Sequence, residues 1–251
     1  MDDTFRPDLF TGQVVLVVGG TTGIGAAIAD AFAAVGAVVT VTGATGHECT
    51  AARENPDFSC RDAVPLDVRD EGSARALLAD LPRLDVLVNC AGIIRRNDEH
   101  EIDVFEEVLA INLTGTMRMC ALARQKLKAA PGKDGGSIVN TASVLSYLGG
   151  GLVPGYSASK GGVAQLTKSL AIAYADEGVR VNAIAPGWVT TSLTQPLQQD
   201  PDRSDAIVAR TPLRRWGQPR DIAGAAVFLC SPAARFITGA ILPVDGGYLV
   251  Y

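Results

Sequence analysis

Short apolar runs rich in valine and isoleucine alternate along this chain with longer stretches in which apolar residues recur every three or four positions. The short runs occupy residues 14–18, 38–42, 63–66, 85–89, 137–141, 179–184 and 240–244. The stretches with helical periodicity lie at residues 25–35, 71–81, 103–127, 157–178 and 219–232. Because continuous apolar strands joined by helices are typical of buried parallel sheets, this pattern predicts strands alternating with crossover helices.

The predicted order of elements indicates an α/β fold. We expect a single doubly wound Rossmann-type domain over residues 1–251, with about seven parallel strands and helices on both faces of the sheet. No composition break or fixed-period repeat suggests a second domain. The longest stretch without clear periodicity is 186–219. Long loops in compact domains are usually functional or disordered, so we expect this one to be a substrate-binding loop or lid.

Charge and composition narrow the class of protein. The chain has 22 basic and 27 acidic residues and a net charge of -5, which gives no reason to expect nucleic acid or a membrane as partner. The first ten residues lack an apolar signal segment, and no run is long enough to span a bilayer, so we expect a cytoplasmic location. Two histidines and five scattered cysteines without ligand spacing predict free buried thiols and no metal site.

A glycine-rich turn follows the first predicted strand, in the sequence VVGGTTGIG. Gly19, Gly23 and Gly25 precede an alanine-rich helix, and glycine there lets the backbone approach a pyrophosphate at the N-terminus of that helix. The alternative is a tight turn that binds no ligand. The turn therefore predicts a dinucleotide site.

The second predicted strand ends without the side chain that usually distinguishes the two nicotinamide cofactors. An acid there holds the ribose 2′-hydroxyl, and a base accepts a 2′-phosphate, yet this chain has Gly43, Ala44 and Thr45. The choice between NAD(H) and NADP(H) stays open. His47 could reach a phosphate or lie in a surface loop, and Asp67 could lie near the adenine or serve as a turn acid.

Tyr156 and Lys160 lie four residues apart, which places their side chains on one helical face. Tyrosine has an ordinary pKa of about 10, so a catalytic tyrosine needs a neighbouring positive charge. Among the five tyrosines, only Tyr156 has a lysine at this spacing. Ser143 follows the fifth predicted strand, where it could donate to a carbonyl oxygen in the ligand crevice.

These motifs together resemble the short-chain dehydrogenase/reductase family over essentially the whole chain. The resemblance rests on the glycine turn, NCAG at 89–92, Asn112 in INLTG, the ordered Ser143, Tyr156 and Lys160, and PGWVTT at 186–191. It implies that Tyr156 is the acid/base, that Ser143 orients the reacting oxygen, and that Lys160 lowers the pKa of Tyr156 and binds the nicotinamide ribose. Asn112 would hold a water behind Lys160, or alternatively bond helix backbone.

The resemblance also implies a cofactor, NAD(H) or NADP(H), and a homotetramer. The implied cofactor contacts are Gly19, Thr22, Gly23, Ile24, Gly25, Gly43, Asp67, Val68, Asn89, Ala91, Gly92, Tyr156, Lys160, Pro186, Gly187, Val189 and Thr191. Two positions depart from the family pattern: Val18 replaces a threonine before the glycine turn, and Cys90 replaces the second asparagine of NNAG. We expect altered local packing around these two positions and retained activity.

Arginines suggest an anionic substrate. Arg95 and Arg96 follow the fourth predicted strand, and the stretch 186–219 carries Arg203, Arg210, Arg214 and Arg215. The surrounding motifs are similar to those of sugar-acid members of the family, the 2-dehydro-3-deoxy-D-gluconate and gluconate 5-dehydrogenases. We therefore expect a small carboxylated, sugar-like substrate. The expected substrate contacts are Arg95, Ser143, Tyr156 and Arg210.

Three alternatives remain at this stage. The arginines could be bound only to water or to acids of the chain itself. The reaction could be reduction of a 3-oxoacyl thioester, although this acidic chain shows no compact basic surface for docking an acyl carrier protein. The chain could also be a non-catalytic dinucleotide-binding regulator, against which the intact Ser143, Tyr156 and Lys160 argue.

Overall fold

Within residues 4–60, 62–130 and 135–251, which the computed structural model describes, seven parallel strands form one sheet. Their spatial order is β3-β2-β1-β4-β5-β6-β7. The strands are β1 (Val14–Val18), β2 (Val38–Gly43), β3 (Asp62–Pro65), β4 (Val86–Asn89), β5 (Ser137–Thr141), β6 (Arg180–Pro186) and β7 (Ile241–Val244). The predicted α/β class and the seven strands are confirmed, each within two residues at its ends.

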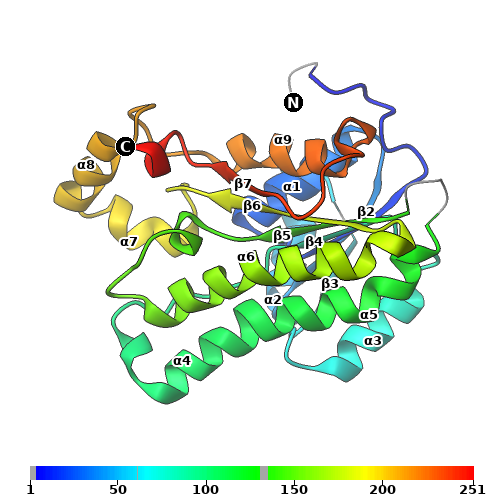
Figure 1. The fold of residues 1–251 in the computed structure, drawn as a ribbon, viewed down its shortest axis with the longest axis horizontal. Helices are drawn as coiled ribbons and strands as arrows, with labels where there is room; N and C mark the ends of the chain where they lie inside the picture. Colours follow the sequence, from blue (N-terminus) through cyan, green and yellow to red (C-terminus); the bar gives the residue numbers. More distant parts are fainter. Residues whose placement is uncertain (1–3, 61, 131–134) are drawn as a thin grey trace.

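Helices cover both faces of this sheet (Figure 1). One face carries α1 (Gly23–Ala34), α2 (Gly46–Glu54) and α9 (Pro219–Cys230), whose buried residues share one core with β1 and β2. The opposite face carries α3 (Glu71–Asp80), α5 (Thr116–Lys128) and α6 (Pro154–Tyr174), with α4 (Ile102–Leu109) packed on α6. Two short helices, α7 (Gln195–Gln198) and α8 (Pro201–Arg210), lie beyond the strand ends.

The central strand β1 shows why the sequence forms a covered sheet. Its side chains alternate between the two cores: Val15 and Val17 contact the α1 side, whereas Leu16 and Val18 contact the α5 side. All five residues of the strand are buried. A strand buried on both faces needs apolar residues at every position, which is the pattern that identified it.

The structure corrects the predicted helices in three places. The stretch 103–127 is not one helix, because a π-helical turn at Ala110–Gly115 separates α4 from α5. The stretch 186–219 is not irregular, because it contains α7 and α8. Asp200 caps the start of α8 by accepting from the Arg203 backbone N–H at 3.2 Å, and Pro201 occupies its first turn. Helix α2 was not predicted.

The strand order places the ligand crevice. Strands β2 and β3 extend the sheet on one side of β1. Strand β4 pairs with β1 on its other side, and β5 to β7 continue the sheet in that direction. Doubly wound sheets bind ligands at the carboxyl ends of the strands, where the order reverses in this way. Within the described residues, no helix is long and apolar enough to cross a membrane.

Candidate active site

A cavity of about 520 Å³ lies at the carboxyl ends of the strands. It brings together the glycine turn, the loops after β2, β3 and β4, the end of β5, the start of α6 and the segment after β6. The predicted residues that line it are Gly19, Thr22, Gly23, Ile24, Gly25, Gly43, Asp67, Val68, Ala91, Gly92, Ser143, Tyr156, Lys160, Pro186, Gly187, Val189 and Thr191. Four predicted residues lie outside it: Asn89, Arg95, Asn112 and Arg210.

The glycine turn needs glycine for steric reasons. Gly19 has φ = 74°, and a Cβ there would lie 2.5 Å from the Ala91 backbone nitrogen. A Cβ on Gly25 would lie 2.1 Å from the Gly19 carbonyl oxygen. Helix α1 starts at Gly23 with no side-chain cap from Thr22 and no acid in its first turn, so its N-terminal N–H groups face the cavity unneutralised. This arrangement fits a pyrophosphate.

The two departures from the family pattern have local replacements. In place of a threonine at position 18, Thr42 on β2 accepts the Gly19 N–H through its hydroxyl at 3.1 Å. In place of an asparagine at position 90, the Cys90 sulfur lies 3.2 Å from the Thr141 hydroxyl and links β4 to β5. Burial raises the pKa of the Cys90 thiol to about 11, so it is a neutral packing group. These contacts are the packing around the two positions in this chain, and the expected difference from the family pattern stays a prediction.

Ser143 and Tyr156 meet in the cavity from different elements. Ser143 begins a short 3-10 turn after β5, where its hydroxyl accepts from the Leu145 N–H at 3.1 Å. The same turn is fixed to α6, because the Ser146 hydroxyl donates to the Lys160 carbonyl at 2.7 Å. Burial raises the pKa of Tyr156 above 10, while a hydrogen bond with Ser143 lowers it and the charge of Glu99 raises it.

Lys160 is a buried cation, with 4% of its surface exposed. Its ammonium donates to the Thr141 carbonyl at 2.6 Å and lies 5.5 Å from the centroid of the Tyr156 ring. Burial lowers the pKa of Lys160 to about 8. Burial of the phenol outweighs the influences that lower the pKa of Tyr156, and the lowering effect expected of Lys160 stays a prediction.

Asn112 lies in the π-helical turn and is fully buried. Its amide oxygen accepts from the Ile93 N–H at 2.8 Å, and its amide nitrogen donates to the Ile93 carbonyl at 3.0 Å and to the Ser159 hydroxyl at 3.1 Å. The side chain thus holds the loop after β4 against α6. Backbone bonding was the alternative interpretation of this asparagine, although the bonded backbone belongs to a loop and not to a helix.

Asn89 is a buried structural residue and not a cavity residue. Its amide donates to the Asn140 side-chain oxygen at 2.9 Å, and Asn140 in turn donates to the Thr167 hydroxyl at 3.0 Å. This chain of polar side chains runs from β4 through β5 to α6 beneath the cavity floor. The side chain points toward α5, where its amide also donates to the Cys120 sulfur at 3.3 Å, and its predicted contact with a cofactor stays a prediction.

Another buried acid, Glu99, was not predicted. One oxygen of its carboxylate accepts from the Tyr156 backbone N–H at 2.7 Å, and the other accepts from the Arg95 N–H at 2.8 Å. Glu99 therefore fixes the first turn of α6, which carries Tyr156, to the loop after β4. Glu99 lies within the charged stretch 95–101, whose composition predicts exposure to solvent, so the sequence did not indicate that it is buried.

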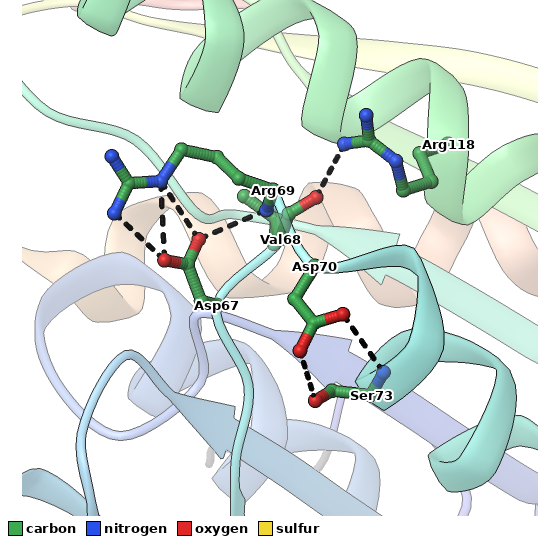
Figure 2. Close-up of polar contacts among 6 residues, drawn as sticks. All are labelled: Asp67, Val68, Arg69, Asp70, Ser73 and Arg118. Carbon is green, nitrogen blue, oxygen red and sulfur yellow. Dashed lines mark hydrogen bonds and ion pairs between the residues drawn. The ribbon is translucent and has the colours of Figure 1, made fainter.

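The loop after β3 also lines the cavity. Figure 2 shows the polar contacts within this loop. The Asp67 carboxylate accepts from the Arg69 N–H at 2.9 Å and from the Arg69 guanidinium at 2.7 to 3.1 Å. This bonding holds the pKa of Asp67 below its ordinary value. Arg118 on α5 donates to the Val68 carbonyl at 2.6 Å and fixes the same loop from behind. Asp67 is thus a turn acid that also lines the cavity.

Most of the arginines expected to bind substrate have partners within the protein. The Arg95 guanidinium lies 3.4 Å from the Glu107 carboxylate, and the Arg210 guanidinium stacks 4.3 Å from the centroid of the Tyr248 ring. Arg215 pairs with Asp221 at 2.5 Å. These contacts favour the alternative in which surface arginines bond the chain's own groups, and neither Arg95 nor Arg210 lines the cavity.

Several cavity residues were not predicted from the sequence. They are Thr21, Thr42, Ala44, Glu48, Leu66, Arg69, Cys90, Ile93, Ile94, Ile111, Thr141, Ala142, Ser192, Leu193 and Thr194. Among them Glu48 and Arg69 carry charge, and both follow strand ends by only a few residues. In the part of the chain that the structure describes, no group of three or more histidine, cysteine or acidic side chains could hold a metal ion.

Comparison with known proteins gives matches over nearly the full length. The family model described as Enoyl-(Acyl carrier protein) reductase matches residues 18–249. The 2-dehydro-3-deoxy-D-gluconate 5-dehydrogenase of Pseudoalteromonas atlantica is 41% identical and aligns with 95% of this chain and 96% of its own length. The D-threitol dehydrogenase of Mycolicibacterium smegmatis is 40% identical and aligns with 100% of this chain and 96% of its own.

The fold is also similar to solved structures. A gluconate 5-dehydrogenase from Burkholderia cenocepacia, crystallised in complex with NADP and tartrate, superposes with a TM-score of 0.89 and is 33% identical. The superposition covers 98% of each chain. The similarity in sequence and in fold therefore extends from the glycine turn to the last strand.

Proposed function

Because this chain belongs to the short-chain dehydrogenase/reductase family, we propose that it transfers hydride between a nicotinamide cofactor and a hydroxy or keto group of a small, sugar-like, carboxylated substrate. The observation that carries the proposal is that Ser143, Tyr156 and Lys160 line the same cavity as the glycine turn. One cavity thus holds a pyrophosphate site and a proton donor. The relatives named above act on sugar acids and a polyol, which supports the substrate class.

The cofactor residues are proposed from the cavity lining. Gly19, Gly23 and Gly25 with the N-terminus of α1 would hold the pyrophosphate, since side chains there would block the approach. Pro186, Gly187, Val189 and Thr191 would contact the nicotinamide end. When bound, the cofactor supplies the hydride, and the protein supplies position and electrostatics.

The protein groups would handle the proton. The Tyr156 hydroxyl, kept protonated by burial, would donate its proton to the substrate carbonyl oxygen during reduction and accept it back during oxidation. Ser143 would hydrogen-bond the same oxygen, and its hydroxyl is oriented by the Leu145 N–H. Lys160 would bond the nicotinamide ribose and stabilise the phenolate, while Asn112 keeps the loop after β4 in place.

Arg96 is another candidate to bind the substrate carboxylate, and like Arg95 and Arg210 it lies outside the cavity lining. Arg96 is half-buried after β4, and its pKa is lowered by burial and by the nearby charge of Arg203 on α8. The charge of Glu99 partly offsets these effects on Arg96, and Arg203 already pairs with Asp200 at 3.7 Å, so an anion beside Arg96 would stabilise the charge of Arg96. We propose that Arg96 takes the role expected for Arg95, and that residues 186–219, including α8, form the substrate-binding loop.

We further propose a cytoplasmic homotetramer, as the family resemblance implies. A subunit interface would cover the exposed apolar side chains that the chain carries on its helices and near its last strand, such as Ile102, Ile172 and Phe236.

The test is a screen of hydroxy and keto sugar acids and of polyols with NAD and NADP in parallel, followed by nicotinamide absorbance. We expect turnover of sugar acids by the intact chain and about 1,000-fold slower turnover by Tyr156→Phe. Turnover confined to 3-oxoacyl thioesters would replace this proposal with an acyl-thioester reductase. If the chain bound the cofactor but turned over no substrate, it would instead be a dinucleotide-binding regulator.

A further inference from the structure

The structure places the carboxylate of Glu48 at the end of β2, although Glu48 comes five residues after the strand in the sequence. The last residues of that strand and its turn are Gly43, Ala44 and Thr45, none of which is charged. Glu48 lies in the first turn of α2, and its carboxylate reaches back to accept the Ala44 N–H at 2.9 Å. A Cβ on Gly43 would lie only 3.1 Å from a Glu48 carboxylate oxygen. The carboxylate therefore sits against the strand end.

The position of this carboxylate is held by the start of the helix. Thr45 caps α2 by accepting from the Glu48 N–H at 3.2 Å, so the backbone of Glu48 and its side chain are both fixed relative to the strand end. Glu48 also lines the cavity together with Thr21, Gly43 and Ala44. Its carboxylate is thus a fixed negative charge in the cavity wall, as well as a partner of the backbone.

The one cation nearby is already neutralised. Besides Lys160 at the other end, the charged residues that line the cavity in the described part of the chain are Glu48, Asp67 and Arg69. Arg69 would be the group to attract a 2′-phosphate, but its guanidinium makes three contacts with the Asp67 carboxylate (Figure 2). Two carboxylates and one guanidinium leave this end of the cavity with a net negative charge.

We propose that Glu48 makes this protein select NAD(H) over NADP(H). The inference rests on the proposed function, in which a nicotinamide dinucleotide binds this cavity, and the doubly wound fold then puts its adenosine ribose at the end of β2. In doubly wound domains an acid at that place bonds the ribose 2′-hydroxyl, and a base accommodates a 2′-phosphate. Glu48 supplies the acid from the first turn of the following helix and not from the strand. A 2′-phosphate, which carries nearly two negative charges, would face Glu48 and a guanidinium already bonded to Asp67.

The inference separates this chain from one of its structural relatives. The gluconate 5-dehydrogenase of Burkholderia cenocepacia was crystallised with NADP. Shared fold and substrate class do not fix the cofactor, because a few side chains at the end of β2 decide it. Glu48 therefore predicts a preference that the comparison alone would not.

The test is direct binding of NADH and NADPH to the intact chain without substrate, by isothermal titration calorimetry at pH 8. We expect NADH to bind on the order of 10 to 100 times more tightly, as one like-charge contact near the protein surface allows. Glu48→Gln keeps an acceptor for the Ala44 N–H but removes the charge. It should tighten NADPH binding about 10-fold and leave NADH binding within about 3-fold.

Glu54→Gln is the matched control, because Glu54 is an exposed residue at the other end of α2 and does not line the cavity. It should leave both dissociation constants unchanged. Adding Asp67→Asn to Glu48→Gln should free Arg69 and tighten NADPH binding further. Circular dichroism would confirm that each variant is folded.

The outcomes distinguish this inference from the proposed function. The role of Glu48 would be overturned if the unaltered chain bound NADPH more tightly than NADH, or if Glu48→Gln changed both dissociation constants equally. Neither result would affect the proposed function. Failure of the folded chain to bind either cofactor would overturn the proposed function, and this inference with it.

Discussion

At the scale of single residues, Tyr156 carries the clearest prediction. Tyr156→Phe should lower kcat by about 1,000-fold, because positioned acid/base catalysis contributes this order of rate and phenylalanine has no proton to exchange. Cofactor affinity should change little, since the ring keeps its shape. Steady-state kinetics together with calorimetric titration of the cofactor would separate the two effects. An equal loss of binding and turnover would contradict a purely catalytic role.

The raised pKa of Tyr156 also sets a direction with pH. At pH 7 the phenol is protonated and ready to donate to a carbonyl oxygen, whereas oxidation of an alcohol needs the phenolate. The rate of oxidation should therefore rise as pH increases through the alkaline range, and the rate of reduction should not. A matched pair of pH profiles checks this, and an oxidation rate that is flat from pH 7 to about 10 would contradict it.

Burial of the charged Lys160 should lower the free energy of unfolding of the protein. Its pKa falls from 10.5 to about 8 on folding, because burial disfavours the charged form. The unfolded chain thus binds more protons between these values, so stability should rise as pH increases from 8 to 10.5 and the full penalty should persist below pH 8. The corresponding free energy is about 3 kcal/mol, and the hydrogen bond to Thr141 offsets part of it.

Lys160→Met tests this balance. At pH 7 the variant should unfold about 2 kcal/mol less easily than the unaltered protein, and the difference should shrink toward pH 10.5, where a lysine is mostly neutral in both states. Activity should be lost at every pH. Urea unfolding at several pH values is the measurement, and a variant that is less stable at pH 7 would show that bonding of the ammonium outweighs its burial.

The same residues show what a sequence reveals about a site. Ser143, Tyr156 and Lys160 could be found because their chemistry and spacing are rare, and the glycines because only glycine fits the turn. Arg95 and Arg210 could not be assigned, since the partner of a long side chain depends on tertiary contacts such as Glu107 and Tyr248. The bonding of Asn89 could not be predicted for a related reason, because its acceptor, Asn140, lies on the neighbouring strand β5.

At the scale of elements, the π-helical turn between α4 and α5 has a structural purpose. Asn112 satisfies both the N–H and the carbonyl of Ile93, and thereby holds the loop that carries the cavity residues Ala91 and Gly92. Asn112→Ala would leave both backbone groups unpaired. We expect a loss of about 2 to 4 kcal/mol in the free energy of unfolding and weaker cofactor binding.

Urea unfolding and cofactor titration of Asn112→Ala check this expectation, with Gln165→Ala as the control on the exposed face of α6. If Asn112 served only to hold a water for proton transfer, the variant would keep its stability and cofactor affinity and lose only kcat. The two roles therefore give different results in the same set of measurements.

Strands and helices differed in how far the sequence predicted them. Strands of the central sheet were found because they are apolar at every position, and α1, α6 and α9 because their periodicity is long. The turn at 110–115 interrupts α4 and α5 without a proline, and the apolar periodicity continues through it. Helices α2 and α8 are short and rich in polar residues, so their periodicity is weak, and each begins at a side-chain cap that the structure reveals, Thr45 or Asp200.

At the scale of the whole molecule, apolar side chains remain on the outer surface of the helices that cover one face of the sheet. Ile102 on α4 is 68% exposed and Ile172 on α6 is 81% exposed, with Met117 on α5 partly exposed. A second set lies near the last strand, where Phe236 is fully exposed and Val250 is nearly so. Two separate apolar surfaces suit a tetramer with twofold axes, which needs two kinds of interface.

The homotetramer can be tested at one of these surfaces. Ile172→Glu places a charge on the exposed face of α6, near its C-terminal end, and burying an unpaired carboxylate costs far more than exposing it. We expect the unaltered chain to migrate as a tetramer in size-exclusion chromatography with light scattering, and the variant as a dimer that retains the Phe236 surface. Ala76→Glu, an equal charge change at an exposed site on α3, should stay tetrameric. A monomeric unaltered chain would contradict the assembly, and a tetrameric Ile172→Glu variant would show that the interface lies elsewhere.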